Sequence, residues 1–103
     1  MSDQPTFDQA KMEAFVGKVL ADTSGATVTV MAYLGDRLNL FKSLANSGPV
    51  TSDELASQAE VNARFTEEWL KAMACAGYVE YEPASDRFVL PPEHVPVLAQ
   101  EAG

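Results

Sequence analysis

Hydrophobic residues at helical spacing mark the first part of the chain. Between residues 12 and 20 they recur at i, i+3, i+4, i+7 and i+8, the pattern of an amphipathic helix. They are Met12, Phe15, Val16, Val19 and Leu20. Thr6 and Gln9 have the spacing of a capping box at the start of this helix. Ser24-Gly25 predicts its end, so the first expected element is a helix that stops near residue 24.

A second helix is predicted over residues 26–38, where the apolar positions cover more than one face of a helical wheel. The β-branched run at 27–30 favours a strand on local propensity, but the wider pattern favours a helix. A helix that is apolar nearly all round is buried on several sides. In a chain of this size, one of those sides is expected to meet another subunit or another domain.

The stretch from residue 51 to residue 90 predicts a helix-turn-helix followed by a β-hairpin. Thr51 and Glu54 form a capping box for a helix over residues 52–59. Asn62 is a favourable N-cap for a longer second helix, and Gly77 is suited to the C′ position that ends it. The hydrophobic period then changes to two over residues 78–82 and 87–90, with turn residues between them.

Residues 40–45 predict a short helix ahead of this unit, with Leu40, Phe41 and Leu44 facing inward. Val50 is expected to form a one-residue bridge to the hairpin. The predicted fold class is therefore mainly α. It is a winged helix-turn-helix, with a three-helix core and a β-hairpin wing, preceded by two N-terminal helices.

Length and composition suit one globular domain, since the chain has 103 residues and 47% of them are hydrophobic. We divide it into N-terminal helices (1–38), a winged helix (39–90) and a tail (91–103). No apolar run approaches the ~18 residues of a membrane span, and the first residues lack the basic segment of a signal peptide. The expected location is cytoplasmic, with no membrane partner.

The charge of the chain argues against a nucleic-acid partner. From Thr51 to Gly103 there are ten acidic residues and three basic ones, which gives a formal charge of −7. Nucleic-acid binding depends on Lys and Arg that neutralise phosphates, and a basic stripe is its usual footprint. Winged helices also act as protein-protein modules, and the charge favours that use here.

No catalytic, cofactor-binding or metal-binding residues are predicted. One His and one Cys do not supply the four N or S donors of a structural zinc site. Cys75 is the only cysteine, so an internal disulfide is excluded. We interpret Cys75 as a small packing residue. His94 has no evident acid-base partner and is expected to be exposed. The glycines are scattered singly, so no Gly-rich phosphate loop is present.

Several runs of residues share their order with a known family. Residues 33–45 read YLGDRLNLFKSLA, residues 48–56 read GPVTSDELA and residues 64–70 read RFTEEWL. Together they resemble the N-terminal domain of two-domain S-adenosylmethionine-dependent methyltransferases, and the resemblance spans nearly the whole chain. Asn39 stands where that family usually has Gly, and Asn also adopts a positive φ readily.

The resemblance implies a winged-helix domain that pairs subunits into homodimers and closes over the substrate side of a separate Rossmann-like catalytic domain. It implies S-adenosylmethionine as the cofactor of the parent protein and a small molecule as its substrate, with no cofactor bound by this chain. The cofactor loop of that catalytic domain appears nowhere in the sequence. The chain is therefore expected to be an excised or truncated N-terminal domain, or else a standalone relative, and not an enzyme by itself.

The expected dimer interface lies mainly on the second predicted helix. Its residues are Val19, Val28, Met31, Leu34 and Leu38. Met31 and Tyr33 are candidates for lining a substrate pocket, with core packing as the other interpretation. Two further functions stay open, a winged-helix transcriptional regulator and a standalone protein-interaction module. A salt-sensitive gel shift with duplex DNA would favour the regulator.

Overall fold

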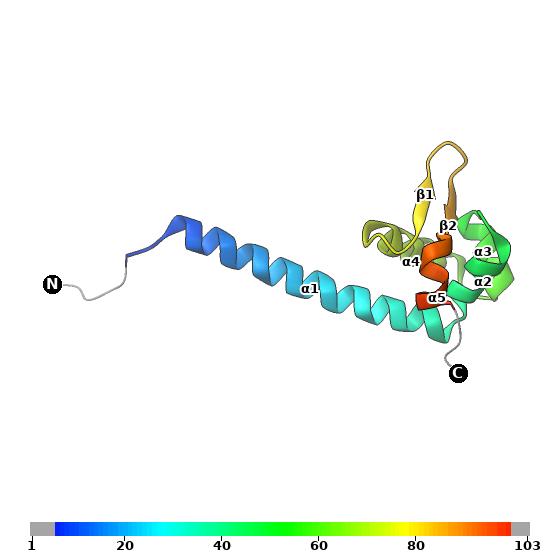
Figure 1. The fold of residues 1–103 in the computed structure, drawn as a ribbon, viewed down its shortest axis with the longest axis horizontal. Helices are drawn as coiled ribbons and strands as arrows, with labels where there is room; N and C mark the ends of the chain where they lie inside the picture. Colours follow the sequence, from blue (N-terminus) through cyan, green and yellow to red (C-terminus); the bar gives the residue numbers. More distant parts are fainter. Residues whose placement is uncertain (1–5, 100–103) are drawn as a thin grey trace.

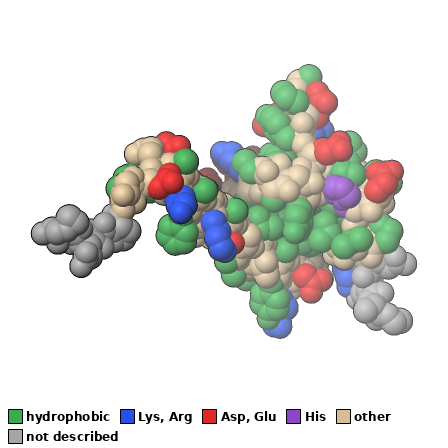
Figure 2. All heavy atoms as spheres, turned by 60° about the vertical axis from the view of Figure 1, so that its left-hand side comes forward, with side chains coloured by type: hydrophobic (Ala, Val, Ile, Leu, Met, Phe, Trp, Pro, Cys, Tyr) green, Lys and Arg blue, Asp and Glu red, His purple; other side chains and the backbone are tan. Residues whose placement is uncertain are grey.

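A computed structural model describes residues 6–99 of the chain. Figure 1 shows one long helix, α1, projecting from a body that contains the remaining elements, so the molecule measures 68 × 37 × 25 Å. Hydrophobic side chains reach the surface of this projecting helix (Figure 2). The elements are α1 (Gln9–Arg37), α2 (Leu40–Ser47), α3 (Ser52–Ala59), α4 (Ala63–Cys75), β1 (Glu80–Glu82), β2 (Arg87–Val89), η1 (Pro92–His94) and α5 (Val95–Leu98).

Helix α1 is continuous, so the expected end at Ser24-Gly25 is wrong, and one N-terminal helix precedes the winged helix instead of two. The hydroxyls of Thr27 and Thr29 donate hydrogen bonds to the carbonyl oxygens four residues earlier, at 3.1 and 2.9 Å. These bonds satisfy the two threonine hydroxyls with carbonyl oxygens of the helix itself, so the polar side chains do not interrupt it. A single interior Gly costs about 1 kcal/mol relative to Ala, which does not end a helix without a competing turn.

The start of α1 also differs from the expectation of a Thr6–Gln9 capping box. Asp8 is the N-cap, and its carboxylate accepts a hydrogen bond from the backbone N–H of Lys11 at 3.1 Å. Aspartate is among the best N-cap residues because its oxygen pairs an otherwise unbonded N–H and its charge suits the helix dipole.

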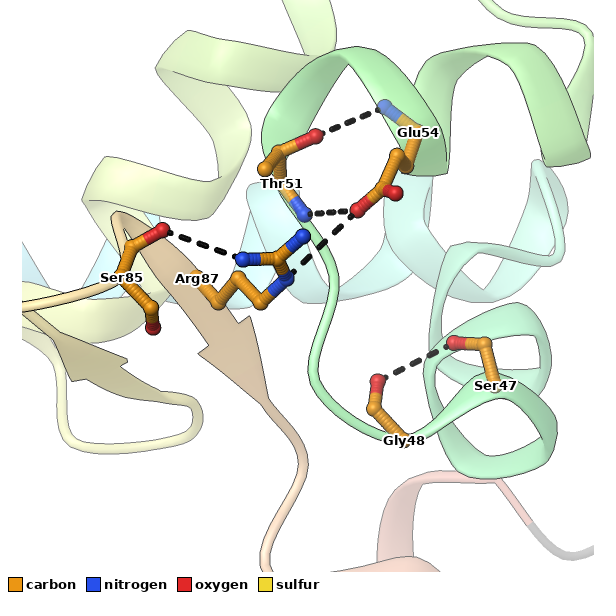
Figure 3. Close-up of polar contacts among 6 residues, drawn as sticks. All are labelled: Ser47, Gly48, Thr51, Glu54, Ser85 and Arg87. Atoms are coloured by element: carbon orange, nitrogen blue, oxygen red, sulfur yellow. Dashed lines mark hydrogen bonds and ion pairs between the residues drawn. The ribbon is translucent and has the colours of Figure 1, made fainter.

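The helices of the winged-helix body form where their local signals lie. Asn39 has φ = 61° and begins α2, as its place in the Gly position of the resemblance suggested. At α3 both bonds of the Thr51–Glu54 capping box are made, at 3.1 and 2.8 Å (Figure 3). Asn62 caps α4 by accepting from the N–H of Phe65 at 2.9 Å. These three predictions are confirmed.

Gly77 ends α4 in a Schellman motif, with φ = 84°. Its N–H donates to Ala74, while the N–H of Tyr78 donates to Met73. Because this motif uses Tyr78, strand β1 begins only at Glu80 and is shorter than expected. It pairs antiparallel with β2, and the predicted bridge from Val50 joins Phe88 through backbone bonds of 3.0 and 2.7 Å.

Trp69 on α4 is the centre of the core and fixes α1 to the body. Its side chain is fully buried, and its ring meets the ring of Phe41 edge to face at 4.9 Å between centroids. Its indole N–H donates to the carbonyl oxygen of Met31 on α1 at 2.8 Å. Gly35, one turn further along α1, is buried directly against the indole. The last third of α1 is thereby held by both packing and a hydrogen bond.

The Glu54 carboxylate gives the wing a pH-dependent contact with α3. The hydrogen bond from the Thr51 N–H, aided by Arg87 at 3.8 Å (Figure 3), lowers the pKa of Glu54 below its ordinary value. A lowered folded-state pKa stabilises the fold above the ordinary glutamate pKa, and this stabilisation is lost as the pH falls through the lower value. An NMR titration of the Glu54 carboxyl carbon should give a midpoint below that of a glutamate in an unstructured peptide. A midpoint at or above the peptide value would contradict the contact.

Candidate functional site

The candidate functional feature is an uncovered apolar surface on α1. It consists of Met12, Phe15, Val16, Val19, Val30 and Tyr33, which we call the α1 stripe. At about 100° of rotation per residue these positions fall on one side of the helix. Their side chains are between 40% and 64% exposed. Large exposed apolar side chains gathered on one side of a helix are typical of a protein interaction site.

The α1 stripe faces away from the body. Val28, Met31 and Ala32, on the other side of the helix, pack against the core, and Gly35 lies against Trp69. Residues 6–27 are all exposed, and α1 projects clear of the body over this length (Figure 1). Within residues 6–99, therefore, no other element covers the stripe.

The structure distributes the expected interface residues over both sides of α1. Val19 and Leu38 are 45% and 36% exposed, and Leu34 is partly buried. Val28 and Met31 are partly buried and pack against the chain's own core. Their apolar character is explained by intrachain packing, whereas that of Val19 is not.

The large apolar residues nearer the N-terminus were not among the expected interface residues. Phe15 and Leu20 are 64% and 63% exposed, and Met12 and Val16 are exposed beside them. Helical periodicity placed them on one face, but periodicity does not show whether that face packs within the chain or against a partner. The sequence did not show how far α1 extends beyond the body, and this length decides whether the apolar face is covered within the chain.

The two candidate pocket residues do not come together in a cavity. Tyr33 is 58% exposed, and its hydroxyl accepts a hydrogen bond from the Arg37 guanidinium at 3.3 Å. The guanidinium also lies 5.8 Å from the Tyr33 ring centroid. Met31 packs against the core. Neither residue lines the pocket of about 320 Å³ at the end of α4, which is formed by Ala76, Gly77, Tyr78, Glu93, His94, Val97 and Leu98.

Two side chains have surroundings that differ from the expectation. His94 is partly buried and not exposed, because its Nδ1 lies 2.8 Å from the carbonyl oxygen of Tyr78. A carbonyl oxygen only accepts, so Nδ1 carries the proton. Cys75 is exposed and not a packing residue, because it lies on the outer side of the last turn of α4. Neither position was predictable from spacing along the chain.

Two of the exposed charged side chains of α4 and the wing, Lys71 and Asp86, have polar partners on their own element. The Lys71 ammonium lies 2.8 Å from the Glu67 carboxylate, and this hydrogen bond raises the pKa of Lys71. The Tyr81 hydroxyl donates to Asp86 at 2.8 Å, which raises the pKa of Tyr81. The Lys71 cation is therefore paired with a carboxylate on a surface where a nucleic-acid-binding protein would need free cations.

Within the described part of the chain, no three His, Cys, Asp or Glu side chains lie together so that they could hold a metal ion. No helix there has the length and apolar character needed to cross a membrane.

The sequence matches the model of a protein family, the Rv2258c-like winged HTH domain, over residues 26–100. This match covers well over half of the chain and includes every helix and strand of the winged-helix body. The chain belongs to this family. A search of curated proteins for relatives of the sequence gave no match.

Solved structures extend the likeness of this winged HTH domain to methyltransferases. The mitomycin 7-O-methyltransferase MmcR superposes with a TM-score of 0.78 at 19% identity, over 90% of this chain and 27% of that one. PigF, solved with SAH, gives 0.71 at 22% identity, over 82% and 25%. Human N-acetylserotonin methyltransferase, solved with SAM, gives 0.63 at 21% identity, over 89% and 26%.

These likenesses concern the fold. The winged HTH domain matches the N-terminal part of the methyltransferases, and it spans about a quarter of their length.

Proposed function

We propose that this chain is the non-catalytic dimerisation and substrate-lid domain of an S-adenosylmethionine-dependent small-molecule methyltransferase. In this proposal residues 1–38 pair two subunits, residues 39–90 form the winged helix, and residues 91–103 lead to a catalytic domain. That domain would bind S-adenosylmethionine and the substrate. The proposal is supported by the shared fold of MmcR, PigF and human N-acetylserotonin methyltransferase.

The observation that carries the dimerisation role is the uncovered α1 stripe. Side chains such as Phe15 and Val16 contribute to stability only when they leave water, at about 25 cal/mol for each Å² of apolar surface buried. In the described chain they are exposed on a helix that has no neighbour along residues 9–27. Isolated helices are marginal in water, so a second copy would stabilise α1 as well as cover it.

The test compares two variants that add the same charge to opposite sides of α1. Val19→Glu places a carboxylate in the α1 stripe and should convert the dimer to a monomer, because an unpaired charge is costly to bury. Ala21→Glu lies two residues away, on the other side of the helix, where the side chain is exposed. It should leave the dimer intact.

Light scattering gives the mass of each protein, and far-UV circular dichroism shows that each remains folded. The dimerisation role is contradicted if the unaltered chain is a monomer, or if Val19→Glu and Ala21→Glu behave alike.

A further inference from the structure

We infer that two copies of this chain pack their α1 stripes together in antiparallel orientation, with the two-fold axis passing between residues 22 and 23. The inference rests on the proposed dimerisation role and adds the geometry of the interface. The stripe extends from Met12 to Tyr33, so this axis lies at its midpoint. A two-fold axis makes the same surface pack against itself, as in most homodimers.

The sizes of the side chains along the stripe fit this register. Met12 lies opposite Tyr33 of the second copy, and Phe15 lies opposite Val30. Near the axis Val19 lies opposite Ala26, which is on the same side of α1 as the stripe. Thr23 is also small and lies at the middle of that side. The helices can therefore approach closely at the centre, while the larger exposed residues fill the space toward both ends.

The charges at the two ends of the stripe favour antiparallel over parallel packing. Asp8 precedes the stripe and Arg37 follows it, both on its side of the helix and both exposed. The proposed register brings Asp8 of each copy opposite Arg37 of the other, at both ends of the interface. Parallel packing would place Asp8 beside Asp8 and Arg37 beside Arg37. Antiparallel packing also sets the two helix dipoles in the favourable sense.

Asp8 and Arg37 remain available for this contact. One oxygen of Asp8 accepts from the Lys11 N–H at 3.1 Å, and a carboxylate has further acceptor positions. Arg37 is held over Tyr33 by the contact between its guanidinium and the Tyr33 hydroxyl at 3.3 Å. Its remaining N–H groups stay free for a carboxylate, because a guanidinium has five donors.

Disulfide crosslinking on a Cys75→Ser background tests the register. Thr23→Cys lies beside the axis and should give a covalent dimer under mild oxidation. Val30→Cys should not, because the two Val30 positions would be about 22 Å apart along the helices at ~1.5 Å per residue. A disulfide needs Cα atoms within about 7 Å. A chain with both Phe15→Cys and Val30→Cys should crosslink, although neither single variant does.

The outcomes separate this inference from the dimerisation role. Crosslinking of Val30→Cys alone in a dimer of the expected mass would overturn the antiparallel register and show parallel packing. A dimer in which neither Thr23→Cys nor the Phe15→Cys/Val30→Cys pair crosslinks would show that the helix packs on another surface, such as the body of the second copy. A monomer by light scattering, before any cysteine is introduced, would overturn the dimerisation role itself.

Discussion

Replacing Trp69 with Ala should lower the free energy of unfolding by about 3–5 kcal/mol, the usual cost of removing a large buried aromatic side chain. The substitution leaves a cavity beside Phe41 and Gly35 and removes the hydrogen bond to Met31. Domains of this size have a total stability of about 5–15 kcal/mol, so the variant loses a large part of it. Urea denaturation followed by far-UV circular dichroism measures the change.

Trp69→Phe is the matched control for this effect. It retains an aromatic ring against Phe41 but lacks the indole N–H that donates to the Met31 carbonyl oxygen. Its loss should be smaller than that of Trp69→Ala, because a single hydrogen bond contributes about 1 kcal/mol and part of the packing is kept. Equal losses for the two variants would show that Trp69 does not act through packing at the junction of α1 and α4.

Gly35→Ala should lower the free energy of unfolding by about 1–3 kcal/mol, although Ala is the better helix former. A Cβ atom at Gly35 would overlap the Trp69 ring at Cζ2 and lie 2.9 Å from Cε2 of Phe41. Both neighbours are rigid, buried rings, so neither can move aside without disturbing the core. The same denaturation measurement applies.

Gly17→Ala separates the overlap from the general effect of removing a glycine. Gly17 lies in the same helix and has no atom within 4 Å of the position of an added Cβ. The substitution should therefore stabilise α1 by about 1 kcal/mol through helix propensity alone. If Gly35→Ala stabilised the protein as Gly17→Ala does, the close packing of α1 on Trp69 would be contradicted.

The junction at Trp69 also bears on dimerisation, because it fixes the direction in which α1 leaves the body. Gly35 and Met31 hold one side of the helix against α4, and this leaves the α1 stripe on the opposite side. The anchored end and the uncovered stripe belong to one uninterrupted helix. The dimer geometry proposed here therefore depends on the same contacts that stabilise the body.

The winged-helix body was predictable because its signals are local. The Thr51–Glu54 capping box predicts the first residue of α3, and Gly77 after an apolar helix predicts the end of α4. Asn39 has the positive φ expected for its position. The capping box and the helix end are decided by residues within one turn of one another, so the sequence alone contains the information, whereas the expectation for Asn39 came from the family resemblance.

The features that the sequence did not predict depend on longer distances. The Ser24-Gly25 pair has the residues of a helix end, yet α1 continues because no turn competes for its backbone bonds. His94 is partly buried by a contact with Tyr78, sixteen residues earlier. The hydrophobic face of residues 12–20 was visible, but its exposure follows from the direction of α1 relative to the body, which periodicity does not encode.

The most direct test of the dimerisation role is the solution mass of the unaltered chain, measured by light scattering over a dilution series. A self-complementary α1 stripe predicts a mass twice the 11.1 kDa of the chain, persisting to low micromolar concentration. A mass of 11.1 kDa at every concentration would contradict it. The stripe would then remain uncovered in solution, and the pairing of subunits would have to be assigned to a different part of the parent protein.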